Sequence, residues 1–323
     1  SSAASDVYKR QHPHRASGFA NERVNAAIKG VAQRALQEGH VMLRRAAAEL
    51  YGYLASLAGS GSLSMQMQFL IDQIVDTRHA DGRAACALAL GQIYTCVGGL
   101  RASPLTKTIN SLTLSLATDP HPAVHACALD ALAQVIEAAG VAYEPYVRST
   151  LGLMTRLLSL PTHEPEGGSP GSSNLRVDWP AYPGIARVVS ALVGVLGPDL
   201  QEAVSTRGVV YALLLHLVQD GGDAAAKEAL LGLQRLGLVV PVLLETRVCA
   251  NLLRHALSRP ILAPSAASLY CQMAQRGSQW LARYGGPSLL ASLLQQLDRH
   301  PTLSGVRTLV LSWLKDTAPA RPC

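Results

Sequence analysis

The sequence predicts an all-α protein in which short helices stack as a one-dimensional array, and three observations lead to this fold class. Similar segments return about every 40 residues along the chain. These segments carry apolar residues at the three- and four-residue spacing of an amphipathic helix, and none alternates with the period of two that marks a strand. Apolar residues make up 49% of the chain but aromatic residues only 5%, a composition that suits closely stacked helices.

The clearest repeat is Thr118–Gly140, with the sequence TDPHPAVHACALDALAQVIEAAG. Two prolines form a turn before a helix, and Gly140 is expected to end that helix in the left-handed conformation of a C-cap. One side of the helix is apolar, so we expect its side chains to be buried between stacked helices. These side chains are Val124, Ala128, Leu129, Ala131, Leu132 and Val135.

Weaker copies of this segment occur on both sides of it. Gly82–Gly99 repeats the pattern, so that Leu90 lies 42 positions before Leu132, and Arg44–Gly59 starts about 38 residues earlier still. Later copies begin at Asp223, Ser265 and Gly305. A period of about 40 residues with two helices per unit is the signature of a HEAT or armadillo-type α-solenoid, here of about seven helical pairs.

The boundaries of the helices follow from apolar periodicity, from capping residues and from glycine and proline breaks. Glycine pairs at 98–99, 221–222 and 285–286 lie at predicted helix ends, and Ser103 and Pro104 suit the start of a helix. In the first helix, the expected apolar face consists of Val24, Ala27, Ile28, Val31 and Ala35. The predicted helices are Asn21–Glu38, Val41–Leu57, Leu63–Val75, Arg83–Val97, Pro104–Ala117, Ala123–Ala139, Tyr143–Leu158, Ile185–Leu196, Asp199–Gln219, Asp223–Val239, Val242–Leu257, Pro264–Tyr284, Pro287–Leu297 and Thr302–Lys315.

The predicted domain organisation is one repeat array with an insertion. Residues 21–160 and 184–316 are expected to form HEAT repeats, and 1–20 a disordered or artefactual N-terminus in which Asp6–Gln11 (DVYKRQ) resembles a translated sequencing adapter. Residues 317–323 are interpreted as a truncated tail of a longer protein, because a solenoid normally ends in a capping repeat.

The insertion, 161–183, holds five Pro, three Gly and three Ser and is expected to be a flexible loop. Ser169-Pro170 within it is a phosphorylation candidate, although a tolerated surface loop is the simpler interpretation. The expected test is limited proteolysis, with cleavage between Glu164 and Asp178 before any repeat helix is cut.

Composition and charge exclude several functional classes. The six cysteines are scattered without a C-x-x-C pair, which indicates reduced thiols in a cytosolic protein. The longest run without charge, Ala84–Leu100, is too short and too polar to predict a transmembrane segment. The net charge of +6 is partly N-terminal, between Arg15 and Arg45, and is interpreted as a solvated helix face, so no nucleic-acid partner is predicted.

Motif searches give no catalytic, cofactor-binding or metal residues, and the protein-binding residues stay unknown. Gly167–Gly171 matches G-x-S-x-G, but Pro170 lacks the N–H that an oxyanion hole needs after the serine. His121 and His125 have the four-residue spacing of metal ligands, but no third ligand is near, and both are interpreted as surface histidines. Gly59-Ser60-Gly61 lacks the third glycine of a dinucleotide-binding loop. No enzyme is predicted.

Asp119–Gly140 resembles the HEAT consensus, in which Asp119 and Pro122 form the turn and Val124 is the first buried residue. The family commonly has Arg where this chain has His125, a departure that weakens the expectation of the usual Asp–Arg ladder between repeats. A narrower resemblance rests on the runs ADGRAACALALGQIYTCVGGL, DPHPAVHACALDALAQVIEAAG and YEPYV, within Ala80–Val147. These runs resemble the HEAT repeat-containing protein 5 family, whose fungal members are large accessory proteins of the first clathrin adaptor complex.

That resemblance implies a long cytosolic scaffold, peripheral on Golgi and endosomal membranes, that binds clathrin-adaptor subunits and accessory proteins in vesicle traffic. It carries over no individual binding residue. A scaffold of nuclear transport or phosphatase assembly is the alternative, and it predicts acidic or aromatic ladders on one face. A third hypothesis is an enzyme with HEAT-like repeats, which requires a convergent cluster of titratable groups in one repeat.

Overall fold

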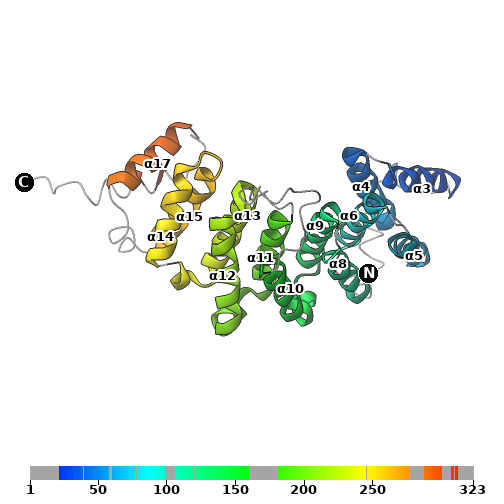
Figure 1. Ribbon diagram of the computed structural model, residues 1–323, viewed down its shortest axis with the longest axis horizontal. Coiled ribbons are helices and arrows are strands. Elements are labelled where there is room, and N and C mark those ends of the chain that lie inside the picture. The colour runs from blue at the N-terminus through cyan, green and yellow to red at the C-terminus, as the bar shows by residue number, and fades with distance from the viewer. Residues whose placement is uncertain are drawn as a thin grey trace, which may run out of the picture. The chain divides into compact units, whose positions relative to one another are not determined.

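The computed structural model describes residues 22–38, 40–57, 60–76, 79–98, 106–119, 121–159, 181–244, 246–276, 287–299, 307–308 and 310–311. Every regular element among these residues is a helix, as the sequence predicts. The chain divides into two compact units, Ser1–Ala139 and Gly140–Cys323. Each unit has its helices in two layers (Figure 1).

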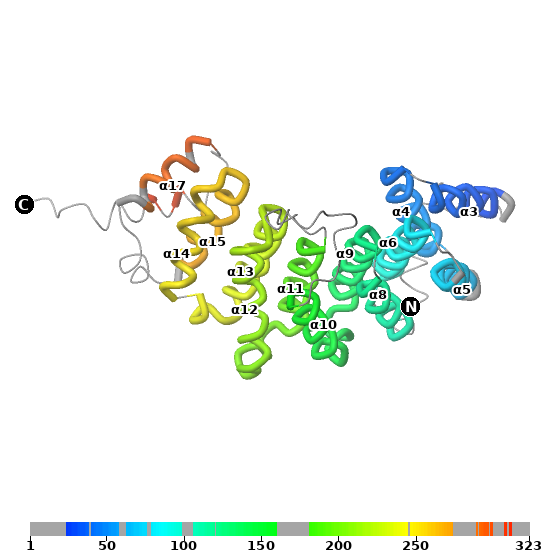
Figure 2. Tube along the Cα trace, in the orientation of Figure 1, coloured from blue at the N-terminus to red at the C-terminus, as the bar shows by residue number. Residues whose placement is uncertain are grey.

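The first unit is built around a row of three helices packed side by side, α4, α6 and α9 (Figures 1 and 2). A second layer covers this row, where α5 packs against α6 and α8 against α9, while α3 packs against α4. Its helices are α3 (Glu22–Leu36), α4 (Val41–Leu57), α5 (Ser60–Asp76), α6 (Ala80–Val97), α8 (Thr106–Leu116) and α9 (Pro122–Ala139). The row therefore consists of the first helices of successive helical pairs, as in a HEAT-type array.

Small residues let the helices of this row approach closely. α6 is buried on almost every side, and four of its buried residues are alanines, Ala84, Ala85, Ala87 and Ala89. A Cβ added to Gly52 would lie 2.8 Å from the backbone oxygen of Gln92. The backbones of α4 and α6 are therefore in direct contact, which leaves no room for a side chain at position 52.

The core of α9 agrees with the sequence prediction. The six predicted side chains are all 0% exposed, and Leu132 is among the largest fully buried ones. The helix ends where Gly140 takes a φ of +54°, and α6 ends before Gly98 at a φ of +84°, so both predicted helix ends fall at a glycine with positive φ.

The second unit repeats the arrangement with α11, α13 and α15 as its row of first helices and with α12 and α14 among the second helices. α12 packs against α13 and α14 against α15. The elements are η2 (Gly140–Tyr146), α10 (Val147–Ser159), α11 (Tyr182–Leu196), η3 (Gly197–Gln201), α12 (Val204–Asp220), α13 (Gly222–Val239), η4 (Pro241–Leu243), α14 (Arg247–Ser258), α15 (Ala263–Arg276) and α17 (Pro287–Arg299).

Three predicted helices of this unit begin later than their apolar pattern suggests. Tyr143–Leu158, Asp199–Gln219 and Val242–Leu257 each start with a short 3₁₀ segment and become α-helical only at Val147, Val204 and Arg247. Each 3₁₀ segment contains a proline, at 145, 198 or 241. Proline has no N–H for the i→i−4 ladder, so a tighter turn precedes the helix proper.

The insertion ends earlier than predicted, because α11 already begins at Tyr182. Pro183 occupies the first turn of this helix, where its missing N–H costs nothing, so a proline that was assigned to the loop belongs to the helix. Residues 160–180 lie outside the described residues, and the loop, its phosphorylation candidate and the Gly167–Gly171 motif stay predictions.

The predicted apolar face of the first helix is only partly buried. Val24 and Val31 are 42% and 53% exposed, and Ala27 is exposed as well. Ile28 and Ala35 are half-buried, and the buried residues are Ala32 and Leu36. α3 packs mainly against α4, so its buried side is set by that one neighbour and not by the widest apolar stripe.

Several other predictions fall outside the described residues. These are the N-terminus with Asp6–Gln11, the cap at Ser103 and Pro104, the glycine pair at 285–286, the end of Pro264–Tyr284 and the tail 317–323. Of the predicted helix Thr302–Lys315, residues 307–308 and 310–311 are described and helical.

Candidate protein-binding surface

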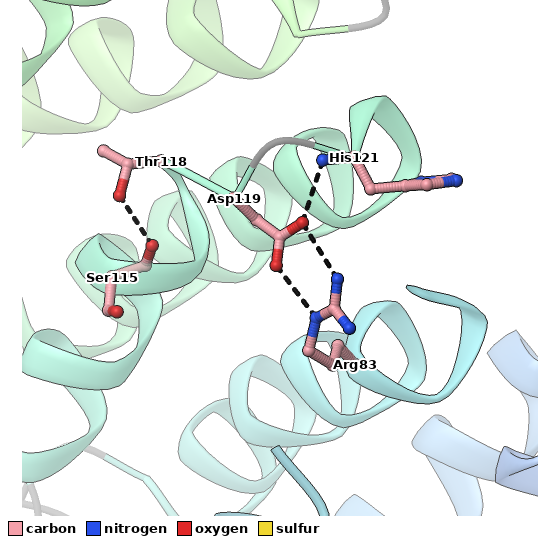
Figure 3. A network of polar contacts seen from close by, with 5 residues as sticks. All are labelled: Arg83, Ser115, Thr118, Asp119 and His121. Atoms are coloured by element: carbon pink, nitrogen blue, oxygen red, sulfur yellow. Dashed lines mark hydrogen bonds and ion pairs between the residues drawn. The ribbon is translucent and has the colours of Figure 1, made fainter. Parts of the chain in front are cut away.

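An ion pair joins the starts of two neighbouring first helices in the first unit. Arg83, in the first turns of α6, donates from Nε to one carboxylate oxygen of Asp119 at 2.9 Å and from an Nη to the other at 3.1 Å (Figure 3). Asp119 lies in the turn before α9, and it also accepts the backbone N–H of His121 at 2.9 Å. This fork-like geometry fixes the turn of one repeat to the helix of the repeat before it.

The charge state of Asp119 follows from these contacts. Burial alone would raise the pKa of this carboxyl, but its contacts with Arg83 and His121 oppose it. Each of these residues contributes a hydrogen bond and an electrostatic attraction, and together they hold the pKa of Asp119 below its ordinary value. The carboxylate therefore stays ionised and paired at neutral pH.

Equivalent Asp–Arg pairs occur between other repeats. The Asp–Arg ladder is therefore present, although His125 stands where the family commonly has an arginine. Arg44 at the start of α4 pairs with Asp81 at the start of α6 at 3.1 Å. In the second unit Asp223, in the first turn of α13, pairs with Arg259 in the turn before α15.

His125 is not a surface residue, because its exposure is 1%. It occupies the position in α9 that Arg83 occupies in α6, 42 residues earlier, and there it is part of the packed interior. His121 is exposed, as predicted. The two imidazoles are therefore in different environments, and among the described residues no group of three or more His, Cys, Asp or Glu gathers to hold a metal ion.

The described cysteines are free thiols with suppressed reactivity. Cys86, Cys249 and Cys271 are buried, and burial raises the pKa of each thiol to about 12. Cys96 and Cys127 are partly exposed, and burial raises their pKa as well, to about 11 for Cys127. A thiol with a pKa near 12 is a poor nucleophile at neutral pH, so the buried Cys86, Cys249 and Cys271 act as small apolar core residues.

Buried tyrosine hydroxyls are likewise used for packing between consecutive segments. The hydroxyl of Tyr94 lies 2.6 Å from that of Thr106, and that of Tyr143 lies 2.9 Å from that of Thr150. Tyr270 donates to the backbone oxygen of Ala250 at 2.9 Å. Each phenol thus satisfies its polar atom inside the array, as a buried hydroxyl requires.

An open groove of about 390 Å³ lies between α12 and α14 in the second unit. Its walls are Val218, Gln219, Val248, Asn251, Leu252, His255, Ala256, Arg259 and Leu262. Apolar side chains dominate these walls, and the titratable ones, His255 and Arg259, are basic or neutral. Val248 is 55% exposed, so its apolar surface is accessible to a partner.

Not all of the basic residues between Arg15 and Arg45 lie on the surface, because one of them is buried in an ion pair. Arg44 is 7% exposed and belongs to the ladder, whereas Arg34 and Arg45 are exposed on helix surfaces. The described part of this stretch therefore carries isolated surface cations, which agrees with a solvated helix face.

Two described segments are long and apolar enough to cross a membrane by length and composition, Pro122–Ser159 and Tyr182–Gln201. About half of each apolar window is buried inside the fold, at 50% and 56%. The first is also interrupted by the 3₁₀ segment that contains Pro145. Core packing of the repeats accounts for the apolar character of both segments.

No protein-family model matches the chain. Protein SWEETIE of Arabidopsis thaliana is 26% identical over 302 residues, which cover 91% of this chain. The chain spans only 13% of the length of that relative.

Among solved structures, an engineered protein superposes with a TM-score of 0.55 at 16% identity, covering 90% of this chain and 67% of its own. The karyopherin Kap121p, bound to the extreme C-terminus of the protein phosphatase Cdc14p, gives a TM-score of 0.45 at 14% identity, over 87% of this chain and 34% of its own. The period of about 40 residues, the paired helices and the ladder between first helices define the fold. The chain is an all-α solenoid of the HEAT/armadillo type.

Proposed function

We propose that this chain is part of a non-enzymatic HEAT-repeat scaffold that binds protein partners in clathrin-adaptor-dependent traffic between Golgi and endosomes. The observation that supports the scaffold role is that the polar side chains inside the fold pair with one another between repeats. The buried or half-buried Asp, Arg and Tyr side chains described above pair with the neighbouring repeat or segment, and so they serve the alignment of helices. Such an array offers a long surface to partners.

The trafficking role rests on the resemblance of Ala80–Val147 to the HEAT repeat-containing protein 5 family. This stretch contains α6 and α9, whose residues carry both the resemblance and the ladder contact of Arg83 with Asp119. By the same resemblance, we place the intact protein in the cytoplasm, peripheral on Golgi and endosomal membranes. Its partners in this proposal are clathrin-adaptor subunits and their accessory proteins.

Within the described residues, the groove between α12 and α14 is a concave feature that can accept a partner side chain. Its apolar wall, with Val248 and Leu252, can accept an apolar side chain from a helix or an extended segment. Asn251 and His255 at the same groove can hydrogen-bond a polar group of the partner beside this apolar anchor, whereas Arg259 is already paired with Asp223.

Proximity labelling of the full-length protein in cells tests the trafficking role. The expected result is enrichment of subunits of the first clathrin adaptor complex over a cytosolic control, reduced by Val248→Glu in the groove. Val242→Glu is the matched control, because Val242 is 72% exposed and lies outside the groove.

Labelling that recovers no adaptor or coat component would contradict the trafficking role. Recovery of nuclear-transport factors or phosphatase subunits instead would favour the alternative scaffold. If Val248→Glu and Val242→Glu label adaptor subunits equally, the partner class would still be supported. The groove would then not be the binding site.

A further inference from the structure

An apolar stripe runs the length of α4, exposed at four of its five residues and half-buried at Leu50. It consists of Leu43, Ala46, Leu50, Tyr53 and Leu57, spaced at i, i+3, i+7, i+10 and i+14, and we call it the α4 stripe. Leu43, Tyr53 and Leu57 are 52%, 63% and 50% exposed. Five apolar side chains at this spacing form one continuous face, which is the pattern of a helix that packs against another helix.

The repeats show which face of the helix this is. Positions 39 residues apart are equivalent in α4 and α6, because Arg44 and Arg83 begin the ladder pairs in the two helices and Gly52 and Gly91 mark the close helix contacts. A shift of 42 residues then relates α6 to α9. By these shifts Tyr53 corresponds to Gln92 and to Gln134.

In α6 and α9, the equivalent face packs against the preceding first helix. A Cβ on Gly52 of α4 would touch Gln92 of α6, and a Cβ on Gly91 of α6 would lie 2.7 Å from Oε1 of Gln134 in α9. The counterparts of Ala46 and Leu50 in α6 are Ala85 and Ala89, and both are 0% exposed. The same face is thus covered in two successive repeats.

α3 packs against α4 away from the α4 stripe, since Gln33 of α3 donates to the hydroxyl of the buried Tyr51. The place of a preceding first helix, beside the α4 stripe, is not filled by any of the described residues.

We infer that the α4 stripe is the docking face for the first helix of a further HEAT-type repeat. The two established interfaces of the row, α4 with α6 and α6 with α9, continue onto this face by the repeat relation. The occupant is an apolar helix with glycine or alanine opposite Tyr53, because the two equivalent contacts place a glycine opposite Gln92 and Gln134.

A second copy of the chain is a poorer fit for the stripe. A two-fold dimer would put like stripes face to face, so the leucines and Tyr53 of each copy would meet equally bulky side chains. Gly52 cannot relieve this crowding, because it is buried against Gln92 of its own chain.

Hydroxyl-radical footprinting of two proteins tests the inference. One is this chain, and the other is the chain extended upstream by about 80 residues of its gene, two repeat lengths. Tyr53 is the probe. Met65, which is 64% exposed on α5, is the exposed control, and Met67, which is 4% exposed on the same helix, reports that the protein is folded.

The expected result is that oxidation of Tyr53 falls at least about fivefold in the extended protein, while Met65 stays reactive and Met67 stays protected. Equal reactivity of Tyr53 in both folded proteins would overturn the inference. Protection of Tyr53 in this chain alone would also overturn it. Protection that rises with protein concentration would identify a second copy as the occupant, and protection at all concentrations would identify a segment of the chain itself.

Discussion

The two compact units build the same row of first helices with different contacts. In the first unit, the arginine belongs to the earlier helix and the aspartate to the later repeat, as in Arg83 with Asp119. In the second unit the order is reversed, because Asp223 is on α13 and Arg259 precedes α15. The ladder position therefore requires opposite charges but not a given order of them.

The two units also differ in the atoms that their helical glycines contact on the neighbouring helix. Gly52 and Gly91 face the backbone or the Cα of the next helix, which cannot move without shifting that helix. Gly232 in α13 faces the Cδ atoms of Leu214, at 2.7 Å and 3.3 Å from a Cβ added there, and a leucine side chain can rotate away. The second unit also uses amide side chains across its row, where Gln272 donates to the backbone oxygen of Gln234 at 2.8 Å. We infer that the first unit is the less tolerant of substitution.

The largest effect is expected from a charge in the core of the first unit. Leu132 is 0% exposed, so Leu132→Asp should lower the free energy of unfolding by about 4 kcal/mol or more, or force the carboxyl to stay protonated. Leu231→Asp is the control, because Leu231 is 39% exposed on α13 of the other unit. Urea denaturation followed by circular dichroism measures both, and equal midpoints would show that the assignment of α9 to the core is wrong.

Alanine substitutions at these glycines should destabilise the first unit more than the second. Gly52→Ala is expected to destabilise the protein by about 2 kcal/mol, because the new Cβ meets backbone atoms of Gln92 and outweighs the gain in helix propensity. Gly232→Ala should be nearly neutral, since Leu214 can rotate and alanine favours the helix. Thermal melts of both variants check this, and the reverse order would contradict the contrast between the units.

A smaller effect is expected from pH. The pKa of Asp119 is lowered in the folded state, so its stabilisation is complete above the unfolded value of about 3.9 and is lost as pH falls through the folded value. Asp119→Asn should therefore cost about 1.5 kcal/mol at pH 7. This difference from the parent protein should shrink below about pH 4. Denaturation at several pH values measures it, and a difference independent of pH would contradict the ionised pairing of Asp119.

Much of the fold could be predicted from the sequence because the repeats are strongly periodic. The period near 40 residues, the helix ends at Gly98 and Gly140 and the buried side of α9 all follow from local pattern, and the structure confirms each. The 3₁₀ starts at Pro145, Pro198 and Pro241 could also have been read from the prolines, which prevent a full α-helical start.

The remaining features depend on contacts between repeats, which a single helical pattern does not encode. His125 lacks the charge of the arginine expected at its position, which weakened the prediction of an ion-pair ladder. Arg44 and Arg83, at the equivalent position of the two earlier helices, nevertheless form the ladder pairs. The exposed face of α3 follows from having one main neighbour. The signal that could have found the ladder was the recurrence of Arg44 with Asp81, and of Arg83 with Asp119, at separations of 37 and 36 residues.

The central claim is that these polar side chains hold successive repeats in register, and a charge-exchange cycle tests it most directly. The cycle compares Arg83→Asp, Asp119→Arg and the double variant with the parent protein in urea denaturation. Each single variant places like charges together, whereas the double variant restores the order found in Asp223 with Arg259. The account predicts that the double variant is more stable than the sum of the single changes by about 1 kcal/mol or more. Additive losses in the double variant would contradict the claim.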